Sequence, residues 1–330
     1  MSTLFLIGNG FDLSCGMKTR YENVYDSYCK IGESDSEIIR KFKKEISSDY
    51  KNWSDFEEGM ARYAADLDSE ADFIECIKDF RNYLQKYLKQ EENKFIEYVS
   101  NNEDIKPLLI EEMRKSVLDY YSKMTPRISN IIKDIHTKSS NNINFISFNY
   151  TNTFDYLINL AFGTEKVFHI HGKLDKYLIM GMDNEKQVNS SYTLTARGKQ
   201  AFVKTYFNNE FDPNKMRIAK DRIERADVIC AFGLSLGESD LTWRNAILNS
   251  LNNLGNHHLF LFDYQLACEQ ALLENDKLDS ELLKRDSILK SWGIQNTETY
   301  INKIHIPCGQ KFFNIEEIIK ENKKQKGVIV

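Results

Sequence analysis

The stretch TLFLIGNGFDLSCGMKTRY, residues 3–21, combines an apolar run with a turn that two glycines bracket. Residues 3–7 are almost wholly apolar and β-prone, which predicts a short strand buried on both faces. Gly8 and Gly10 surround Asn9, and glycine here allows positive φ and a close approach of the backbone to a ligand. The amides of such a turn can point at a phosphate. A tight strand-to-helix turn without a ligand stays open as the alternative.

The turn differs from the motifs of two familiar nucleotide-binding classes. Leu13 stands at the third glycine position of the dinucleotide fingerprint, and no acidic residue ends a second strand about twenty residues on. This disfavours a hydride-transfer dehydrogenase. No Walker lysine follows Gly10, which disfavours a P-loop NTPase.

Composition sets further bounds. A chain of 330 residues, 42% of them hydrophobic, can bury a large core in one elaborated domain or two. The net charge of −5 provides no basic field for nucleic acid. The six cysteines are scattered without a C-x-x-C, which predicts a reduced, cytoplasmic environment and no zinc cluster. We expect no signal peptide and no membrane span, because no basic region precedes the first apolar run and no run is long enough.

Residues 22–139 read as helical. Five apolar residues recur at three- and four-residue spacing and predict one helix face: Phe73, Ile77, Phe80, Leu84 and Leu88. Pro126 is expected to begin another helix. We interpret 22–139 as a large α-helical insert or cap after the first strand. Residues 1–21 and 140–330 would then form one domain.

Short apolar runs alternate with helical patterns in the second half of the chain. The expected strands are residues 143–148, 167–170, 177–180, 228–232, 258–262 and 299–306. The expected helices include residues 216–225, 241–251, 265–273 and 282–292, with a polar surface element or lid at 184–214. This alternation predicts an α/β fold, a Rossmann-like parallel sheet with helices on both faces.

Polar clusters follow several of the predicted strands. In open parallel sheets ligands bind outside the carboxyl ends of the strands, so clusters from distant parts of the chain are expected to converge on one cleft. These clusters are residues 8–12, 149–152, 171–172, 233–240 and Asp263.

Each polar residue has a functional and a structural interpretation. Asn149 can orient a water or a ribose hydroxyl, or hold its own turn. His171 can act as a general acid or base, or be structural. Asp12 can bind a ribose or a water, or cap the following turn. Ser235 can sit in a loop whose amides bind phosphate, or in an ordinary loop. Asp240 is expected to cap the helix at residue 241, with a second role at the cleft.

His169 and His171 form a His-x-His pair that could bind metal if both lay on one strand and pointed the same way. The carboxylates that follow, Asp175 and Asp183, have no telling spacing. We therefore assign no metal ligand.

Several segments together resemble a known family. Residues 6–13, LIGNGFDL, with Gly16, Thr19 and Tyr21, resemble the opening motif of the AbiH family of bacteriophage abortive-infection proteins. The resemblance continues, in order along the chain, at residues 53–57 (WSDFE), 148–151 (FNYT), 169–172 (HIHG) and 232–240 (FGLSLGESD).

AbiH-like proteins in turn resemble, remotely, the sirtuin-like NAD-binding domains of several anti-phage systems. This resemblance implies that Asn149 holds the water or ribose and that His171 is the active-site base, with Asp12 beside them. It implies a set of cofactor-binding residues in the glycine-rich turn, in the later loop under the cofactor and at the adenosine ribose: Gly8, Asn9, Gly10, Phe11, Gly233, Ser235, Asp240 and Asp263. Thr151 stands where sirtuin-like motifs usually carry Asp. No zinc-binding cysteine set exists, so protein deacetylation is not expected.

The resemblance implies a cytoplasmic antiviral protein that binds NAD or a related nucleotide, as ligand or substrate, and hydrolyses its N-glycosidic bond. One alternative is a non-catalytic nucleotide-binding sensor that signals to a partner. A second is a metal-dependent nuclease or phosphohydrolase built on His169, His171 and Asp175 or Asp183. A phage-derived trigger and a homo-oligomer are further partners to test.

Overall fold

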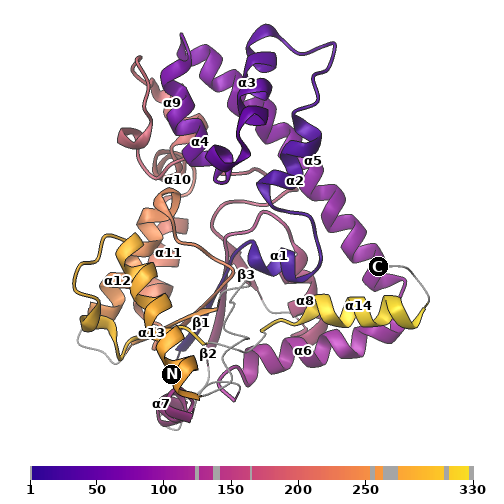
Figure 1. The fold of residues 1–330 in the computed structure, drawn as a ribbon, viewed down its shortest axis with the longest axis vertical. Coiled ribbons are helices and arrows are strands. Elements are labelled where there is room, and N and C mark those ends of the chain that lie inside the picture. Colours follow the sequence, from indigo (N-terminus) through magenta and orange to yellow (C-terminus); the bar gives the residue numbers. More distant parts are fainter. Residues whose placement is uncertain are drawn as a thin grey trace.

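The computed structural model describes residues 2–122, 126–136, 142–163, 166–252, 257–262, 274–307 and 312–326. Its centre is a six-stranded parallel sheet in the order β3-β2-β1-β4-β5-β6, with helices on both faces (Figure 1). The strands are β1 (Ser2–Ile7), β2 (Asn142–Ser147), β3 (Val167–His169), β4 (Val228–Phe232), β5 (His258–Phe262) and β6 (Ile304–His305). The predicted α/β class and parallel sheet are therefore confirmed.

The strands of the sheet are apolar because both of their faces are buried. In β1, Phe5 and Ile7 belong to the hydrophobic core on one face, while Leu4 and Leu6 belong to the core on the other. This alternation follows from the two-residue period of a strand. A strand of this kind reads as a continuous apolar run, which is why residues 3–7 predicted it.

Two groups of helices cover the two faces of the sheet. One face packs against α6 (Lys106–Leu118), α8 (Thr153–Phe162) and α14 (Ile315–Gln325), and the other against α11 (Pro213–Glu224), α12 (Leu241–Asn252) and α13 (Glu274–Ser291) (Figure 1). The remaining helices near the sheet are α1 (Gly10–Ser14) and α7 (Pro126–His136).

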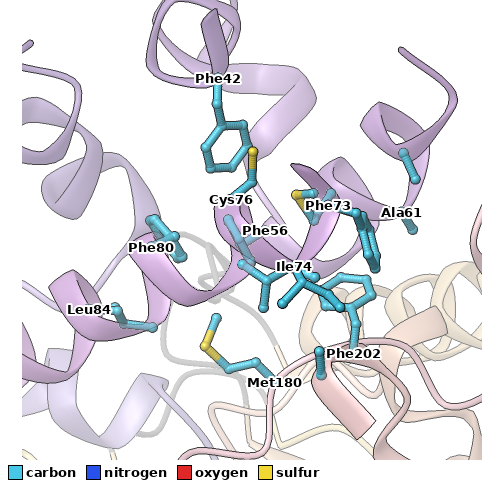
Figure 2. Close-up of a cluster of buried hydrophobic side chains, with 14 of the residues drawn as sticks. Phe42, Phe56, Ala61, Phe73, Ile74, Cys76, Phe80, Leu84, Met180 and Phe202 are labelled. Carbon is cyan, nitrogen blue, oxygen red and sulfur yellow. The ribbon is translucent and has the colours of Figure 1, made fainter. Parts of the chain in front are cut away.

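A separate hydrophobic core lies beyond the carboxyl edge of the sheet. It gathers side chains from α2 (Tyr21–Tyr28), α3 (Glu37–Ser48), α4 (Phe56–Tyr63), the first half of α5 (Glu70–Ser100) and α9 (Ala196–Phe202). Figure 2 shows Phe42, Phe56 and Phe80 in this core together with Met180 and Phe202 from the later part of the chain. The rings of Phe56 and Phe80 stack with their centroids 3.8 Å apart.

The predicted helical insert is divided between two cores. Its first part packs in the core of Figure 2, together with residues 174–203. Its later part, from Phe95 to Ile132, packs against the sheet in the same core as Phe5 and Phe145. The change of core therefore falls within α5, not at residue 139.

Some predicted elements differ from the structure. Residues 177–180 do not form a strand, because Leu178 makes only an isolated antiparallel bridge to Gly172. The strand expected at 299–306 is reduced to β6, after a 3-10 turn at Thr297–Tyr300. The segment 184–214 contains α9 and α10 (Lys204–Phe211), and α14 was not predicted. The helix expected at 265–273 lies outside the described residues.

Among the helices that the structure describes, none combines the length and apolar character that crossing a bilayer would require.

Candidate functional site

The candidate site lies at the point where the strand order reverses, between β1 and β4. Gly8, Asn149 and Gly233 follow the carboxyl ends of β1, β2 and β4, which are neighbours in the sheet. A doubly wound sheet opens a crevice at such a position, because connections leave the two neighbouring strands in opposite directions.

The crevice has two adjoining parts, which we call the inner chamber and the outer groove. The inner chamber has a volume of about 200 Å³ and is lined by Gly8, Asn9, Asp12, Thr19, Tyr21, Asp55, Glu57, Leu84, Leu88, Phe148, Asn149, Tyr150, Thr151, His171, Lys204, Gly233, Leu234, Ser235, Ser239 and Asp240. The outer groove has a volume of about 550 Å³ and is lined by Asn9, Gly10, Leu13, Arg20, Tyr21, Glu22, Ser54, Asp55, Ala231, Gly233, Leu234, Ser235, Leu261, Phe262, Lys284, Ile288, Ser291, Trp292 and Ile306. They share Asn9, Tyr21, Asp55 and residues 233–235.

Most of the site residues predicted from the sequence meet in this crevice. The inner chamber brings together Gly8, Asn9, Asp12, Asn149, His171, Gly233, Ser235 and Asp240. Gly10 lines the outer groove. Phe11 does not line either part. Its ring is fully buried in the core, with centroids 4.9 Å from Phe154 and 5.1 Å from Phe313. Asp263 lies outside the described residues.

Gly8 and Gly10, in the turn after β1, allow the loop after β4 to pack closely against this turn. The Gly8 amide donates to the carbonyl oxygen of Phe232 at 2.9 Å, and the Gly10 amide donates to that of Gly233 at 3.0 Å. A Cβ on either glycine would overlap with the backbone at Gly233. The prediction that these amides point at a phosphate is therefore wrong for Gly8 and Gly10, because both donors are already used.

Asn9, between them, is also committed to the protein. Its Oδ1 accepts a 2.6 Å hydrogen bond from the Thr19 hydroxyl, and its Nδ2 donates to the Thr19 carbonyl oxygen at 3.1 Å. Asn9 thereby fixes the loop after α1 at the mouth of the crevice.

The loop at residues 233–237 offers the donors that the first turn lacks. Within the described parts of the chain, the amides of residues 234–237 make no hydrogen bond to another protein group. Leu236 has a φ of 52°, in the left-handed region. The buried Arg244 supports the loop, with Nη2 donating to Glu238 Oε1 at 3.0 Å. Successive amides in such a loop can form an anion-binding concavity.

Residues 233–237 read Gly-Leu-Ser-Leu-Gly, which also has the spacing of the nucleophile elbow of α/β hydrolases. In an elbow the serine itself takes the strained conformation, whereas here the positive φ angles belong to Gly233 and Leu236. Among the hydrogen bonds of the described residues, none joins the Ser235 hydroxyl to His171. The contact between nucleophile and base that a serine hydrolase needs is therefore missing.

Asp12 is a buried carboxyl that lines the inner chamber. Its Oδ2 accepts a 2.7 Å hydrogen bond from the Thr151 hydroxyl, while its Oδ1 is buried with no hydrogen-bond partner among the described residues. Burial raises the pKa of Asp12 to about 7, against the opposing effect of the Thr151 hydrogen bond. A carboxyl with this pKa can accept or donate a proton near neutral pH. Asn149 links the loops after β2 and β1 by donating from Nδ2 to the Gly8 carbonyl oxygen at 3.1 Å.

His171, Asp240 and Lys204 form a buried cluster of ionisable side chains that also lines the inner chamber. Lys204 Nζ lies 3.0 Å from Asp240 Oδ1 and donates to the Ser239 carbonyl oxygen at 2.7 Å. His171 Nε2 lies 3.3 Å from Asp240 Oδ1, within ion-pair distance, but it makes no hydrogen bond of standard geometry among the described residues.

The charges of this cluster set its protonation states. Burial acts to raise the pKa of Asp240, but Lys204 and His171 outweigh it and hold that pKa well below its usual range. Burial and the Lys204 charge lower the pKa of His171. At neutral pH the imidazole is therefore neutral and able to accept a proton.

The sequence predicted that the Asp240 side chain caps α12, but it does not. It ends a 3-10 turn, and its carboxylate is bound to Lys204. The helix amide of Thr242 donates instead to Asp183 Oδ2.

His169 and His171 point to different surroundings. His169 Nε2 lies 2.8 Å from Asp155 Oδ2, and its Nδ1 lies 3.0 Å from the Asn149 carbonyl oxygen. β3 ends at His169, so the strand geometry that would align the two rings does not reach His171. Within the described residues, no group of three or more His, Cys, Asp or Glu side chains is placed to hold a metal ion.

Tyr21, Glu57 and Lys204 are among the residues of the inner chamber that the sequence analysis did not assign to the site. Glu57 accepts a 2.9 Å hydrogen bond from the Tyr21 hydroxyl, and burial raises the pKa of Glu57 to about 8. The motif at 53–57 was a usable signal, since it carries part of the family resemblance. Lys204 gave no signal, because it stands in a polar segment without a motif.

The fold and the crevice define an α/β protein of the Rossmann type with a ligand-binding cleft at the reversal of its strand order. The chain matches the family described as bacteriophage abortive infection AbiH over residues 4–262, and it belongs to this family. Membership assigns the protein a role in phage abortive infection. No curated protein and no solved structure matches the chain. The resemblance to sirtuin-like domains stays a prediction.

Proposed function

We propose that the crevice binds NAD or a related nucleotide and hydrolyses its N-glycosidic bond during phage abortive infection. One observation carries the proposal. Asp12 Oδ1 and His171 Nε2, two buried polar atoms that make no hydrogen bond of standard geometry among the described residues, belong to side chains that line one chamber beside a larger groove. Buried polar groups are normally paired, so two unpaired groups in one chamber favour a polar ligand.

The inner chamber and the outer groove differ in volume, and we propose that they hold different portions of one dinucleotide. Pockets for small molecules usually measure about 300–1,000 Å³. The outer groove, at about 550 Å³, falls in this range, and the inner chamber, at about 200 Å³, does not. The ribose and its leaving base would occupy the inner chamber. The phosphates would meet the amides of residues 234–237, and the second nucleoside would lie in the groove against Phe262 and Trp292.

The proposed reaction forms a bond between a water oxygen and C1′ of the ribose as the bond from C1′ to the nicotinamide ring nitrogen breaks. The bonding electron pair goes to the ring nitrogen, so nicotinamide leaves uncharged, and the proton of the water goes to a base. His171 would be this base because its lowered pKa keeps it neutral. Asn149, fixed by Gly8, would orient the water or a ribose hydroxyl.

The pairing of Asp12 with Thr151 adds support. Thr151 stands where the sirtuin-like motif usually carries a carboxylate, and the structure brings the Asp12 carboxyl within 2.7 Å of the Thr151 hydroxyl. An acidic group is thus present at this place, supplied by a different strand-end loop.

The test is release of nicotinamide from NAD by wild type, His171→Ala and His257→Ala. His257 is the control because its ring bonds to Ser250, away from the crevice. Loss of a general base is expected to reduce the rate by about a hundredfold or more, with His257→Ala unchanged. If the purified protein neither binds nor consumes any NAD-like nucleotide, the proposal fails.

A second function, a nucleotide-binding sensor, is favoured by the contacts of α5. Along this helix Gln85 donates to the Leu174 carbonyl oxygen at 2.6 Å, Glu91 accepts from the Lys18 amide at 2.9 Å, and Glu92 accepts from the Asn152 amide at 2.5 Å. One helix thus holds the loops that follow β1, β2 and β3. A movement of α5 would displace all three loops, and nucleotide binding at these loops would displace α5. Phage defence retained by His171→Ala would select the sensor over the hydrolase.

A further inference from the structure

We infer that Glu57, together with Asp12, is a specificity-determining residue that selects the cationic nicotinamide ring of the oxidised dinucleotide over the neutral dihydro form. This inference rests on the proposed function, because it concerns the same inner chamber. It differs from the roles expected from the family resemblance, which assigns nothing to Glu57.

The position of Glu57 is fixed by the helical core, not by the sheet. Glu57 lies in the first turn of α4 and is only 6% exposed. The hydroxyl of Tyr21 holds one carboxyl oxygen at 2.9 Å. The ring of Tyr21 packs in turn against Phe56 and Phe80, with centroids 6.0 and 6.2 Å away. The carboxyl is therefore held in the chamber wall by neighbours that cannot easily move.

Four carboxyls line the chamber, those of Asp12, Asp55, Glu57 and Asp240, and among the ion pairs of the described residues only Asp240 has a paired cation. Asp240 has Lys204 at 3.0 Å. Among the ion pairs of the described residues, none involves Glu57 or Asp12. A buried carboxylate without a counter-charge is costly, so such a group stays protonated until a cation arrives. The pKa values of Glu57, about 8, and Asp12, about 7, agree with this state, and burial is the main cause of both.

The ionisable groups near Glu57 and Asp12 leave the two carboxyls without a fully compensating positive charge. The ionisable groups around Glu57 are Asp55, Lys204, Tyr21, Tyr25, Tyr150 and Arg81. Those around Asp12 are Glu92 and Cys15. The Lys204 charge lowers the pKa of Glu57 but does not cancel the effects of burial and Asp55, which raise it. The chamber is therefore acidic in composition, and near pH 7 without a ligand Glu57 is mostly protonated and Asp12 is partly protonated.

A bound cation would reverse this protonation. Opposite charges attract more strongly in a buried chamber than in water, and a nearby positive charge favours the ionised carboxyl. The pyridinium ring of NAD carries such a charge, whereas the ring of NADH is neutral. NAD would therefore bind with release of a proton from the chamber, and NADH without it. This gives the selectivity a signature that does not depend on catalysis.

The experiment is calorimetric titration of wild type, Glu57→Gln and Glu58→Gln with NAD and with NADH, near pH 7. His171→Ala is present in all three backgrounds to stop turnover. Repeating each titration in buffers of different ionisation enthalpy counts the protons released. Gln keeps an oxygen to accept the Tyr21 hydrogen bond. Glu58→Gln removes the same charge one residue along α4, from a side chain that does not line the chamber.

The expected result is a preference for NAD over NADH of about tenfold, the equivalent of one pKa unit, with proton release on binding NAD only. Both should be retained in Glu58→Gln and reduced in Glu57→Gln. A preference and a proton count that are the same in Glu57→Gln and wild type would overturn the inference and leave the proposed function standing. If wild type binds neither dinucleotide, the proposed function fails and this inference with it. A cooperative thermal transition in each variant shows that the comparison is between folded proteins.

Discussion

Gly10 and Gly233, which both line the outer groove, are in direct backbone contact. The amide of Gly10 donates a 3.0 Å hydrogen bond to the carbonyl oxygen of Gly233, and a Cβ on either residue would overlap with the backbone of the other. Gly233 also has a φ of 62°, a conformation that favours glycine. The loops after β1 and β4 are thus fixed to each other by two residues that have no side chain.

Gly10→Ala is expected to destabilise the protein, because the clash is with backbone atoms that cannot rotate away. Overpacking of this kind costs about 1–3 kcal/mol in the free energy of unfolding. Urea denaturation measures it. Gly32→Ala is the matched control, since a Cβ there would come no closer than 3.5 Å to Asp35. Equal stability of the two variants would show that the loops can separate without cost.

The sheet could be predicted from the sequence because its strands are buried on both faces. β1, β2, β4 and β5 are apolar runs, and each begins and ends within about two residues of its prediction. Residues 177–180 were equally apolar, but Leu178 and Met180 are buried in the core of Figure 2 without a partner strand. α14 was missed because its charged sequence is stabilised by tertiary packing of Ile315 and Ile319.

The sequence predicted those site residues that directly follow the carboxyl ends of strands. Gly8, Asn149 and Gly233 converge because parallel strands end at one edge. Phe11 was misplaced because α1 begins at Gly10 and turns successive residues to different sides, so that Asp12 lines the chamber while Phe11 enters the core. Glu57 and Lys204 come from helices that do not follow a strand of the sheet directly, so the rule that ligands bind at strand ends could not predict them.

Lys204→Met is expected to raise the pKa of His171. The Lys204 charge lowers that pKa, while Asp240 acts to raise it and would remain beside the imidazole. We expect an upward shift, measured by NMR titration of the His171 ring. Removing one partner of a buried pair should also cost about 3–5 kcal/mol in the free energy of unfolding.

Lys199→Met is the control for this prediction, because Lys199 pairs with Glu185 at the surface. Its His171 titration should match that of wild type. The same His171 pKa in Lys204→Met and Lys199→Met would mean that Lys204 does not tune the imidazole.

Asp12 and Glu57 are expected to make the protein less stable as the pH rises. Their pKa values are raised from 3.8 to about 7 and from 4.5 to about 8, mainly by burial. Between the lower and upper values the folded protein binds more protons than the unfolded chain, so the free energy of unfolding falls with increasing pH. The fall should amount to a few kcal/mol and be complete above about pH 8.

Urea denaturation at about pH 5.5 and about pH 8.5 measures this fall. Glu57→Gln should reduce it, because the amide does not titrate. Glu97→Gln, at an exposed position of α5, should leave it unchanged. A fall of the same size in Glu57→Gln would show that other groups cause the dependence on pH.

Thr151→Val tests the hydrogen bond that supports the Asp12 carboxyl. Valine has nearly the shape of threonine but cannot donate to Asp12 Oδ2, so this oxygen, like Oδ1, would lack a hydrogen-bond partner among the described residues. The cost is expected to be about 1–3 kcal/mol in the free energy of unfolding. The pKa of Asp12 should rise above about 7, because the hydrogen bond from Thr151 acts to lower it. Carbon-detected NMR titration of the Asp12 carboxyl measures the shift.

Thr153→Val is the control, since among the described residues the buried Thr153 hydroxyl donates only to the sulfur of Met17, at 3.4 Å. A thioether is a weak acceptor, so this variant should lose less stability and leave the Asp12 titration unchanged. If both variants titrate like wild type, Thr151 contributes packing alone. The acidity of the chamber would then be set by burial, and the choice of Thr at this position would have no electrostatic cause.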